Sequence, residues 1–180
     1  SIAKSIQEKL LPSDINTLKV PDVSAFYMPA FEVGGDYYDV IKKSEDDFWF
    51  LIADVSGKGV NAAFHVAKMK GIFNALSQTE MGLEDFVLKA NDAVCECFEK
   101  GVYITLILLN IDIKNKLLTW SRSGHCPIIY WDNKNKAAKI LDDKGLGLGI
   151  LKSPKFKKHC HVNQRNYNEG DLIVLYTDGV

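Results

Sequence analysis

The run Phe48-Trp49-Phe50-Leu51-Ile52-Ala53 contains no polar side chain. Successive side chains of a β-strand point to opposite faces of its sheet, so a strand made only of apolar residues is buried on both faces. The run therefore predicts a central strand in a sheet that is covered on each side. This requirement favours folds in which sheets and helices pack as layers.

The hydrophobic period changes twice along the chain. Residues 1–11 have the spacing of a short helix, and residues 23–30, 37–41 and 48–53 have the pattern of strands. Two segments of helical spacing follow, from Val60 to Leu76 and from Leu83 to Phe98, and Gly101 is the expected C-cap of the second helix. Strands are expected again over 102–111, 116–122, 127–131, 137–141, 156–162 and 171–177. Successive hairpins predict mostly antiparallel sheet, so the fold class is α+β in layers.

Composition excludes several classes of function. Twenty-two Lys and Arg against 23 Asp and Glu leave a net charge of −1, so no strongly basic surface is expected and no nucleic acid partner is implied. The apolar runs are too short to span a bilayer, and no signal peptide pattern is present. Four cysteines without paired spacing fit a reducing compartment. We therefore expect one cytoplasmic domain with no membrane insertion.

Two carboxylates are expected to face each other across the first hairpin. The polar segment 42–47 joins two predicted strands, so the hairpin is centred near Glu45. Opposite residues in an antiparallel pair have a constant sum of sequence numbers, which sets Asp36 of GGDYYD opposite Asp54 of IADVSGKG. Opposed like charges destabilise a sheet, and neither strand contains Lys or Arg. The pair therefore predicts a divalent cation held by oxygen ligands.

The residues around this pair fit the same interpretation. Gly34 and Gly35 would let backbone and solvent approach an ion where a side chain would block it. The last predicted strand delivers a third carboxylate, Asp178, so three strand ends could surround one metal cluster. The alternative is that each Asp caps a turn, as strand-end Asp residues commonly do. The register of Asp36 with Asp54 favours the metal.

Three further polar features each have two interpretations. The segment DVSGKGVNAA has the shape of an anion-binding helix N-terminus, so Lys58 could contact a phosphate or be an exposed turn lysine. His125 of SGHCP could donate a proton to a leaving oxygen, or be a hydrogen-bonded turn residue. His159 and His161 alternate along a predicted strand, where a zinc site is conceivable but exposed strand histidines are the simpler interpretation.

Five motifs, taken in order, resemble those of a known family. They are EVGGDYYDV, LIADVSGKGVNAA, SRSGHCPIIY, GLGLGI and DLIVLYTDGV. Over nearly the whole chain, their order and spacing resemble the SpoIIE/RsbU-type branch of the PPM (type 2C) protein serine/threonine phosphatases. The resemblance implies a four-layer α-β-β-α sandwich of two mainly antiparallel sheets that binds two Mn²⁺ or Mg²⁺ ions at one sheet edge. It also implies that a metal-bridging water attacks the phosphorus of phosphoserine or phosphothreonine in line.

The resemblance also implies roles for individual residues. Asp54 would bridge the metals, the backbone carbonyl of Val55 would be a ligand, and Asp36 and Asp178 would complete much of the coordination. Asp36, Asp54 and Asp178 are thus the expected catalytic residues as well as metal ligands. Asp39 matches a family position with a supporting or accessory-metal role.

One family ligand has no counterpart in the sequence. The family supplies another metal-binding Asp after the TDG motif, and the sequence ends at Val180. We therefore expect residues 13–180 to be a phosphatase domain truncated at its C-terminus. One of its two metal positions should be weakened.

The resemblance implies partners too. Residues 1–12, which contain IQEKLLP, resemble the end of a linker helix from an upstream sensor or receiver domain, and the stripe of Ile2, Ile6 and Leu10 could form a homodimer. The implied substrate is a phosphorylated protein in bacterial signal transduction, a STAS-type anti-sigma-factor antagonist. One alternative is a non-catalytic partner-switching module that keeps the fold. Another, a metal-dependent phosphodiesterase or nuclease, is disfavoured because the sequence lacks a basic surface.

Overall fold

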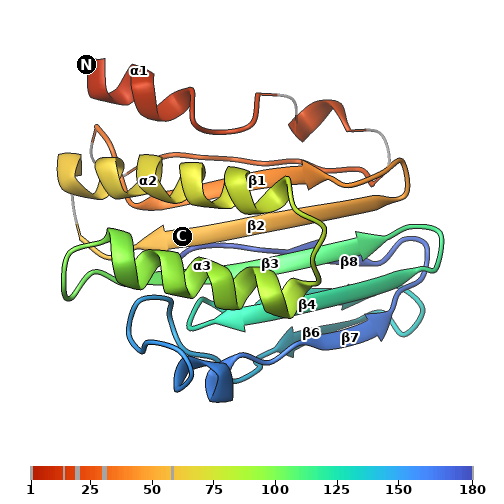
Figure 1. Cartoon of the computed structure of the whole chain (residues 1–180). Helices are drawn as coiled ribbons and strands as arrows, with labels where there is room; N and C mark the ends of the chain where they lie inside the picture. Colours follow the sequence, from red (N-terminus) through yellow and green to blue (C-terminus); the bar gives the residue numbers. More distant parts are fainter. Residues whose placement is uncertain (1, 14, 19–20, 30–31, 58, 180) are drawn as a thin grey trace.

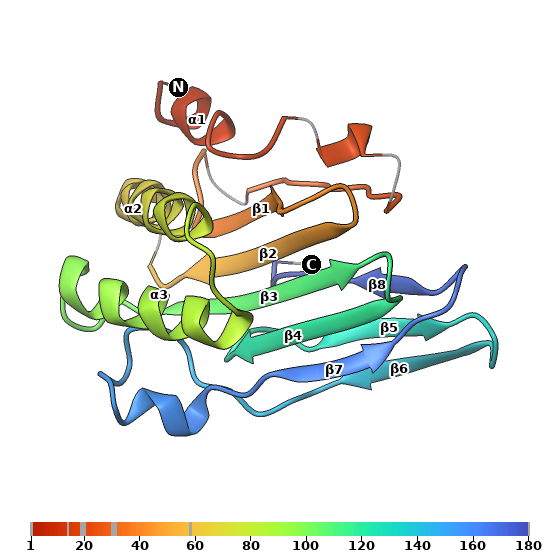
Figure 2. The ribbon, with the colours of Figure 1, turned by 45° about the vertical axis from the view of Figure 1, so that its right-hand side comes forward.

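The computed structural model describes residues 2–13, 15–18, 21–29, 32–57 and 59–179. Within them, the chain forms two antiparallel sheets, and two long helices cover the outer face of the larger sheet (Figure 1). A view turned by 45° shows the order of the layers, which is helices, larger sheet and smaller sheet (Figure 2). The α+β sandwich expected from the sequence is confirmed.

The larger sheet has the strand order β1-β2-β3-β4-β7, and every neighbouring pair is antiparallel. Its strands are β1 (Asp36–Lys42), β2 (Asp47–Val55), β3 (Ile104–Asp112), β4 (Leu117–Ser123) and β7 (Asn163–Asn166). The smaller sheet has the order β6-β5-β8 and is also antiparallel. Its strands are β5 (Ile128–Asp132), β6 (Ala137–Leu141) and β8 (Leu172–Val174).

The two long helices are α2 (Gly59–Ser77) and α3 (Leu83–Cys97), which lie side by side over the larger sheet (Figures 1 and 2). The apolar spacing of α3 explains its position, because Leu83, Phe86, Val87, Ala90 and Val94 are all buried. Three short helices complete the described chain. These are α1 (Ile2–Glu8), which contacts α2, and the 3-10 helices η1 (Ile15–Thr17) and η2 (Phe156–His159).

Strand β2 separates two hydrophobic cores. Trp49, Leu51 and Ala53 belong to the core between the helices and the larger sheet, where the Trp49 ring meets the Phe86 ring edge to face at 5.7 Å. Phe48 and Phe50 belong to the core between the two sheets. The apolar run is therefore buried on both faces, as its sequence predicts, because alternate side chains enter different cores.

Three local predictions are wrong. Residues 23–29 form no strand in the described chain, although their burial alternates, and the Ala25 N–H bonds the Asn16 side chain at 2.9 Å. Residue 30 lies outside the described residues. The expected strand over 156–162 begins as helix η2, and strand pairing starts only at β7. Helix α3 is capped by Phe98, whose N–H donates to Val94, whereas Gly101 lies in the turn that follows with a φ of 94°.

The outer face of the smaller sheet carries no helix within the described chain (Figure 2). Of the two helical layers that the resemblance implies, the described residues form the one that covers the larger sheet. Among the described residues, the helices lack the combination of length and apolarity that a membrane span requires.

Candidate metal centre

The first hairpin brings two carboxylates to one edge of the larger sheet. Strands β1 and β2 pair with Asp36 opposite Asp54 and Lys42 opposite Phe48, which confirms the predicted register and the hairpin centre. Asp36 opens β1 and Asp54 stands next to the end of β2, and both residues are half-buried. Local sequence therefore sets this pair, because a short turn and strand pairing determine what lies opposite.

Gly35 is needed for the close approach of these two strands. A Cβ atom at position 35 would collide with the carbonyl oxygen of Val55 and would lie 2.9 Å from Asp54 Oδ1. The Val55 N–H donates to the Gly35 carbonyl oxygen at 3.1 Å. Glycine thus lets the backbone pack directly against Asp54 and the Val55 carbonyl.

Gly34 has a different role from the one expected. A Cβ atom there would meet only ordinary van der Waals contacts, the nearest at 3.6 Å. Its backbone is bound by Gln7 of α1 instead: the Gln7 amide nitrogen donates to the Gly34 oxygen at 2.6 Å, and the Gly34 N–H donates to Gln7 Oε1 at 3.0 Å. Gly34 therefore ties α1 to the start of β1.

The third carboxylate comes from the end of the chain. Asp178 follows β8 of the smaller sheet and is exposed. A Cβ atom built at Gly179 would lie 3.8 Å from Asp36 Oδ2, so this segment reaches the edge formed by β1 and β2. The Thr177 side chain hydrogen-bonds Asp36 and opposes the rise in its pKa. The larger sheet and the segment after β8 therefore contribute to one acidic cluster.

The electrostatics of the cluster favour a cation. Burial, together with the charges of Asp36 and Asp178, raises the pKa of Asp54 to about 6. Burial likewise raises the pKa of Asp36, and Asp178 adds to the rise. Each ionised carboxylate therefore disfavours the others, and a bound divalent cation would remove this cost.

The donors present suit a hard divalent cation. They are all oxygens, from the carboxylates of Asp36, Asp54 and Asp178 and from the Val55 carbonyl, as Mn²⁺ and Mg²⁺ prefer. Within the described residues, no three His, Cys, Asp or Glu side chains are arranged as a ready metal cage. The oxygen donors, taken by type, match Mg²⁺ or Mn²⁺, since such an ion can bind through one or two carboxylates and keep several waters.

Asp39 lies apart from this cluster. It stands three residues after Asp36 on β1, so its side chain points to the opposite face of the sheet. There it accepts hydrogen bonds from the Tyr37 hydroxyl and from Lys70 Nζ of α2, the latter at 2.5 Å. Asp39 therefore joins β1 to α2 on the face of the sheet opposite to Asp36.

His125 is a buried hydrogen-bonded residue between β4 and β5. Its Nε2 lies 3.0 Å from the Tyr176 carbonyl oxygen, and its Nδ1 lies 2.7 Å from Thr105 Oγ1. A carbonyl oxygen only accepts, so Nε2 carries the hydrogen and Nδ1 accepts from the Thr105 hydroxyl. Burial lowers the pKa of His125 to about 4. The turn-residue interpretation is confirmed, and neither ring nitrogen is free to donate to a leaving group.

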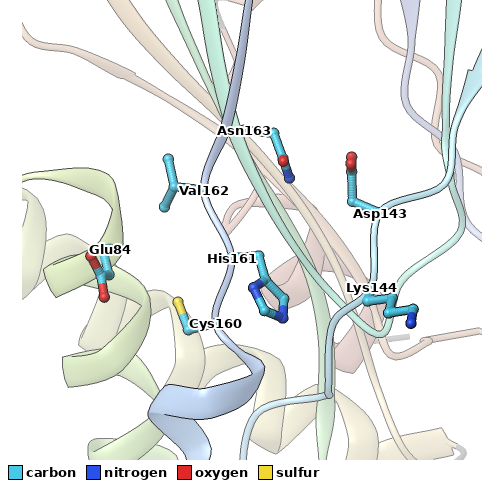
Figure 3. A pocket seen from close by; sticks show the side chains of 7 residues that line it. All are labelled: Glu84, Asp143, Lys144, Cys160, His161, Val162 and Asn163. Carbon is cyan, nitrogen blue, oxygen red and sulfur yellow. The ribbon is translucent and has the colours of Figure 1, made fainter.

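The other two candidate features lie elsewhere. Lys58 falls outside the described residues. His159 ends η2, so it does not share a strand face with His161, and the described residues contain no zinc group of His and Cys. His161 lines a polar pocket of about 460 Å³ (Figure 3). In this pocket His161 and Asn163 lie on the side of Asp143 and Lys144, whereas Cys160 and Val162 lie on the side of Glu84.

Sequence reasoning missed two polar groups beside the carboxylates. Thr177 contacts Asp36 from the segment after β8. The Tyr27 hydroxyl is buried and makes no hydrogen bond among the described residues, and burial raises its pKa to about 12, with Asp36 and Glu8 adding to the rise. Side chains alternate along an extended segment, so Tyr27 lies on the same side as Val23 and Ala25, which pack on the core between the sheets.

Solved structures show the class of fold. The SiaA-PP2C domain of Pseudomonas aeruginosa matches with a TM-score of 0.81 and 14% identity, over 96% of this chain and 67% of that one. The catalytic domain of the serine/threonine protein phosphatase PstP, solved with two manganese ions, matches with a TM-score of 0.52 and 13% identity, over 74% of each chain. The described chain therefore has a PP2C-type fold.

Sequence comparison shows the family. The chain belongs to the SpoIIE family, since the family model described as Stage II sporulation protein E (SpoIIE) matches residues 44–180. The phosphoserine phosphatase RsbU of Bacillus subtilis is 30% identical over 179 residues. That match covers 99% of this chain and 52% of RsbU, so the chain spans about half the length of this relative.

Proposed function

We propose that this chain is a metal-dependent protein phosphatase that hydrolyses phosphoserine or phosphothreonine on a regulatory protein. The observation that carries the proposal is the pairing of Asp36 with Asp54 beside the segment that holds Asp178. The name of RsbU, a phosphoserine phosphatase, and membership of the SpoIIE family support it. The two manganese ions described for PstP support a metal at this edge.

The chain's own residues would hold and orient the reacting groups. Asp36, Asp54 and the Val55 carbonyl would bind Mn²⁺ or Mg²⁺ from the larger sheet, and Asp178 would bind from the segment after β8. Ions bound there would supply an activated water and stabilise charge on the phosphoryl oxygens. The raised pKa values of Asp36 and Asp54 mean that an empty cluster holds protons more readily, so a metal and protons compete for the same oxygens.

The proposal is tested by phosphate release. The chain is incubated with a phosphoserine-containing protein and Mn²⁺, and Asp54→Asn is compared with Asp85→Asn, a matched change at an exposed position of α3. Removing a group that only supports a metal ligand lowers metal affinity or activity by about 10- to 100-fold. Asp54→Asn alters a proposed ligand itself, so it should lower the rate of phosphate release by at least about 100-fold. Asp85→Asn should leave the rate unchanged. Turnover that survives both Asp54→Asn and EDTA would reject the mechanism.

We also propose a STAS-type anti-sigma-factor antagonist as substrate and an upstream sensor or receiver domain as partner. The resemblance of residues 1–12 to a linker helix supports the second of these. In α1, Ile2 and Ile6 are exposed, whereas Leu10 just after the helix packs on the core, so the first two remain available to a second copy. Partner binding that ignores metal, without turnover, would favour the non-catalytic module instead.

A further inference from the structure

One side chain links the larger sheet to the segment after β8, beside the carboxylates. His125 is 4% exposed and lies in the turn between β4 of the larger sheet and β5 of the smaller one. Its two ring nitrogens contact Thr105 Oγ1 at 2.7 Å and the Tyr176 carbonyl oxygen at 3.0 Å. These partners are 71 residues apart in sequence, since 176 − 105 = 71. The ring therefore bridges distant parts of the chain.

Both ends of this bridge adjoin proposed ligands. Thr105 is the strand partner of Asp54 across the β2–β3 ladder. Tyr176 lies two residues before Asp178, in a segment that follows the end of β8 at Val174. The Tyr176 carbonyl is thus held by a side chain at a point where ladder pairing has ended. The bridge connects the sheet that carries Asp54 to the segment that carries Asp178.

The turn that holds His125 is itself well anchored. Arg122 donates a hydrogen bond to the His125 carbonyl oxygen, and its Nε donates to the Asp143 carbonyl oxygen at 2.8 Å. Gly124 has a φ of 67°, and a Cβ atom there would lie 2.9 Å from the backbone nitrogen of Gly147. The ring is therefore held in place from its own backbone as well as from its two nitrogens.

We propose that His125 is a positioning residue that sets the separation of Asp54 and Asp178 and thereby the affinity of the carboxylate cluster for a divalent cation. The proposal rests on the proposed function, because it assumes that these carboxylates bind metal. Residues that orient metal ligands typically change metal affinity by about 10- to 100-fold. His125 acts here through Thr105 and the Tyr176 carbonyl, and it does not transfer a proton.

The test is Mn²⁺ binding by the whole chain, measured by calorimetry. His125→Ala removes both hydrogen bonds and should weaken Mn²⁺ binding by about 10- to 100-fold. His125→Gln can still donate to the Tyr176 carbonyl and should recover most of the affinity. Thr105→Val removes only the hydrogen bond to His125 Nδ1 and should give a smaller loss of Mn²⁺ affinity. His161→Ala, a histidine substitution in a pocket whose lining includes none of the three carboxylates, should bind like the wild type.

A second measurement separates positioning from proton transfer. At saturating Mn²⁺, His125→Ala should regain kcat to within about threefold, because the metal then restores the cluster. Wild-type Mn²⁺ affinity in His125→Ala, or a kcat that stays lost at saturating metal with unchanged affinity, would overturn the proposal. If His125→Ala does not fold by circular dichroism, the affinities of His125→Gln and Thr105→Val decide instead.

The same binding data distinguish the two proposals. A wild-type chain that binds no Mn²⁺ would overturn both the metal site and the positioning role. Binding that is lost in Asp54→Asn but retained in His125→Ala and Thr105→Val would overturn the positioning role alone.

Discussion

Asp54 carries an electrostatic cost that the folded chain cannot relieve by itself. Its carboxylate is half-buried, faces Asp36 across the hairpin and lies within the field of Asp178. In the unfolded chain the same group is hydrated and has an ordinary pKa of 3.8. Functional residues commonly reduce stability in this way, because the arrangement that binds a ligand is strained without it.

This cost predicts a pH-dependent gain in stability for Asp54→Asn in EDTA. The folded-state pKa of about 6 is above the unfolded value of 3.8, so ionisation of Asp54 destabilises the metal-free fold. The penalty is absent below about pH 4 and complete above about pH 6. Asp54→Asn should therefore melt a few degrees higher than the wild type at pH 7.5 and at nearly the same temperature at pH 4.

The melting temperature is measured at pH 4, 5, 6 and 7.5 in EDTA, with Asp85→Asn as the matched control. Excess Mn²⁺ should reverse the order at pH 7.5, because only the wild type gains binding energy from the metal. An Asp54→Asn protein that is no more stable than the wild type above pH 6 would contradict the electrostatic account.

At the level of elements, strand β1 carries one Asp on each face, and the two have different surroundings. Asp36 points toward the carboxylate edge, whereas Asp39 points toward α2 and pairs with Lys70. The Lys70 ammonium also lies 5.7 Å from the centre of the Tyr37 ring. The period of two along a strand therefore assigns one Asp to the candidate site and the other to helix packing.

Lys70→Met should weaken the packing of α2 on β1 without affecting the metal. Asp39 would keep its bond from Tyr37 and lose its cation, which predicts a loss of about 1–2 kcal/mol in the free energy of unfolding. Urea denaturation measures this loss, and Lys70→Met combined with Asp39→Asn should recover part of it. Mn²⁺ affinity should stay at the wild-type value. A tenfold fall in affinity would restore Asp39 to the metal site.

Across the whole molecule, the two sheets differ in how they are covered. Helices α2 and α3 cover the larger sheet, whereas the smaller sheet exposes Ile140, Leu172 and Val174 by 69%, 56% and 38%. The register sets Ile140 beside Ile129 and Ile129 beside Val174, so an apolar row crosses all three strands. An exposed apolar face of this kind promotes association.

Ile140→Lys combined with Leu172→Lys should therefore reduce self-association of this chain. Both side chains are exposed, so the free energy of unfolding should change by less than about 1 kcal/mol. Light scattering during concentration measures the effect. Ile150→Lys, at a position 49% exposed in the loop after β6, is the control and should have little influence. If Ile150→Lys reduces self-association equally, the effect comes from the change in net charge and not from the apolar face.

The local sequence pattern was sufficient to predict the elements whose contacts are close in sequence. The β1–β2 register followed from a short hairpin, and α2 and α3 followed from a helical period that tertiary packing preserved. The pairing of Asp36 with Asp54 was predictable for the same reason. Residues 23–29 and 156–159 were not, since an extended pattern becomes a strand only where a neighbouring strand supplies hydrogen bonds.

The layered α+β class, the first hairpin and the candidate ligands Asp36 and Asp54 could be predicted from local sequence. Three contacts could be seen only in the folded chain: Asp39 faces a helix lysine, Thr177 reaches Asp36, and His125 spans from Thr105 to Tyr176. These contacts join segments from different elements, and two of them join the larger sheet to the segment after β8. Their geometry depends on how the sheets and helices pack, which no local period encodes.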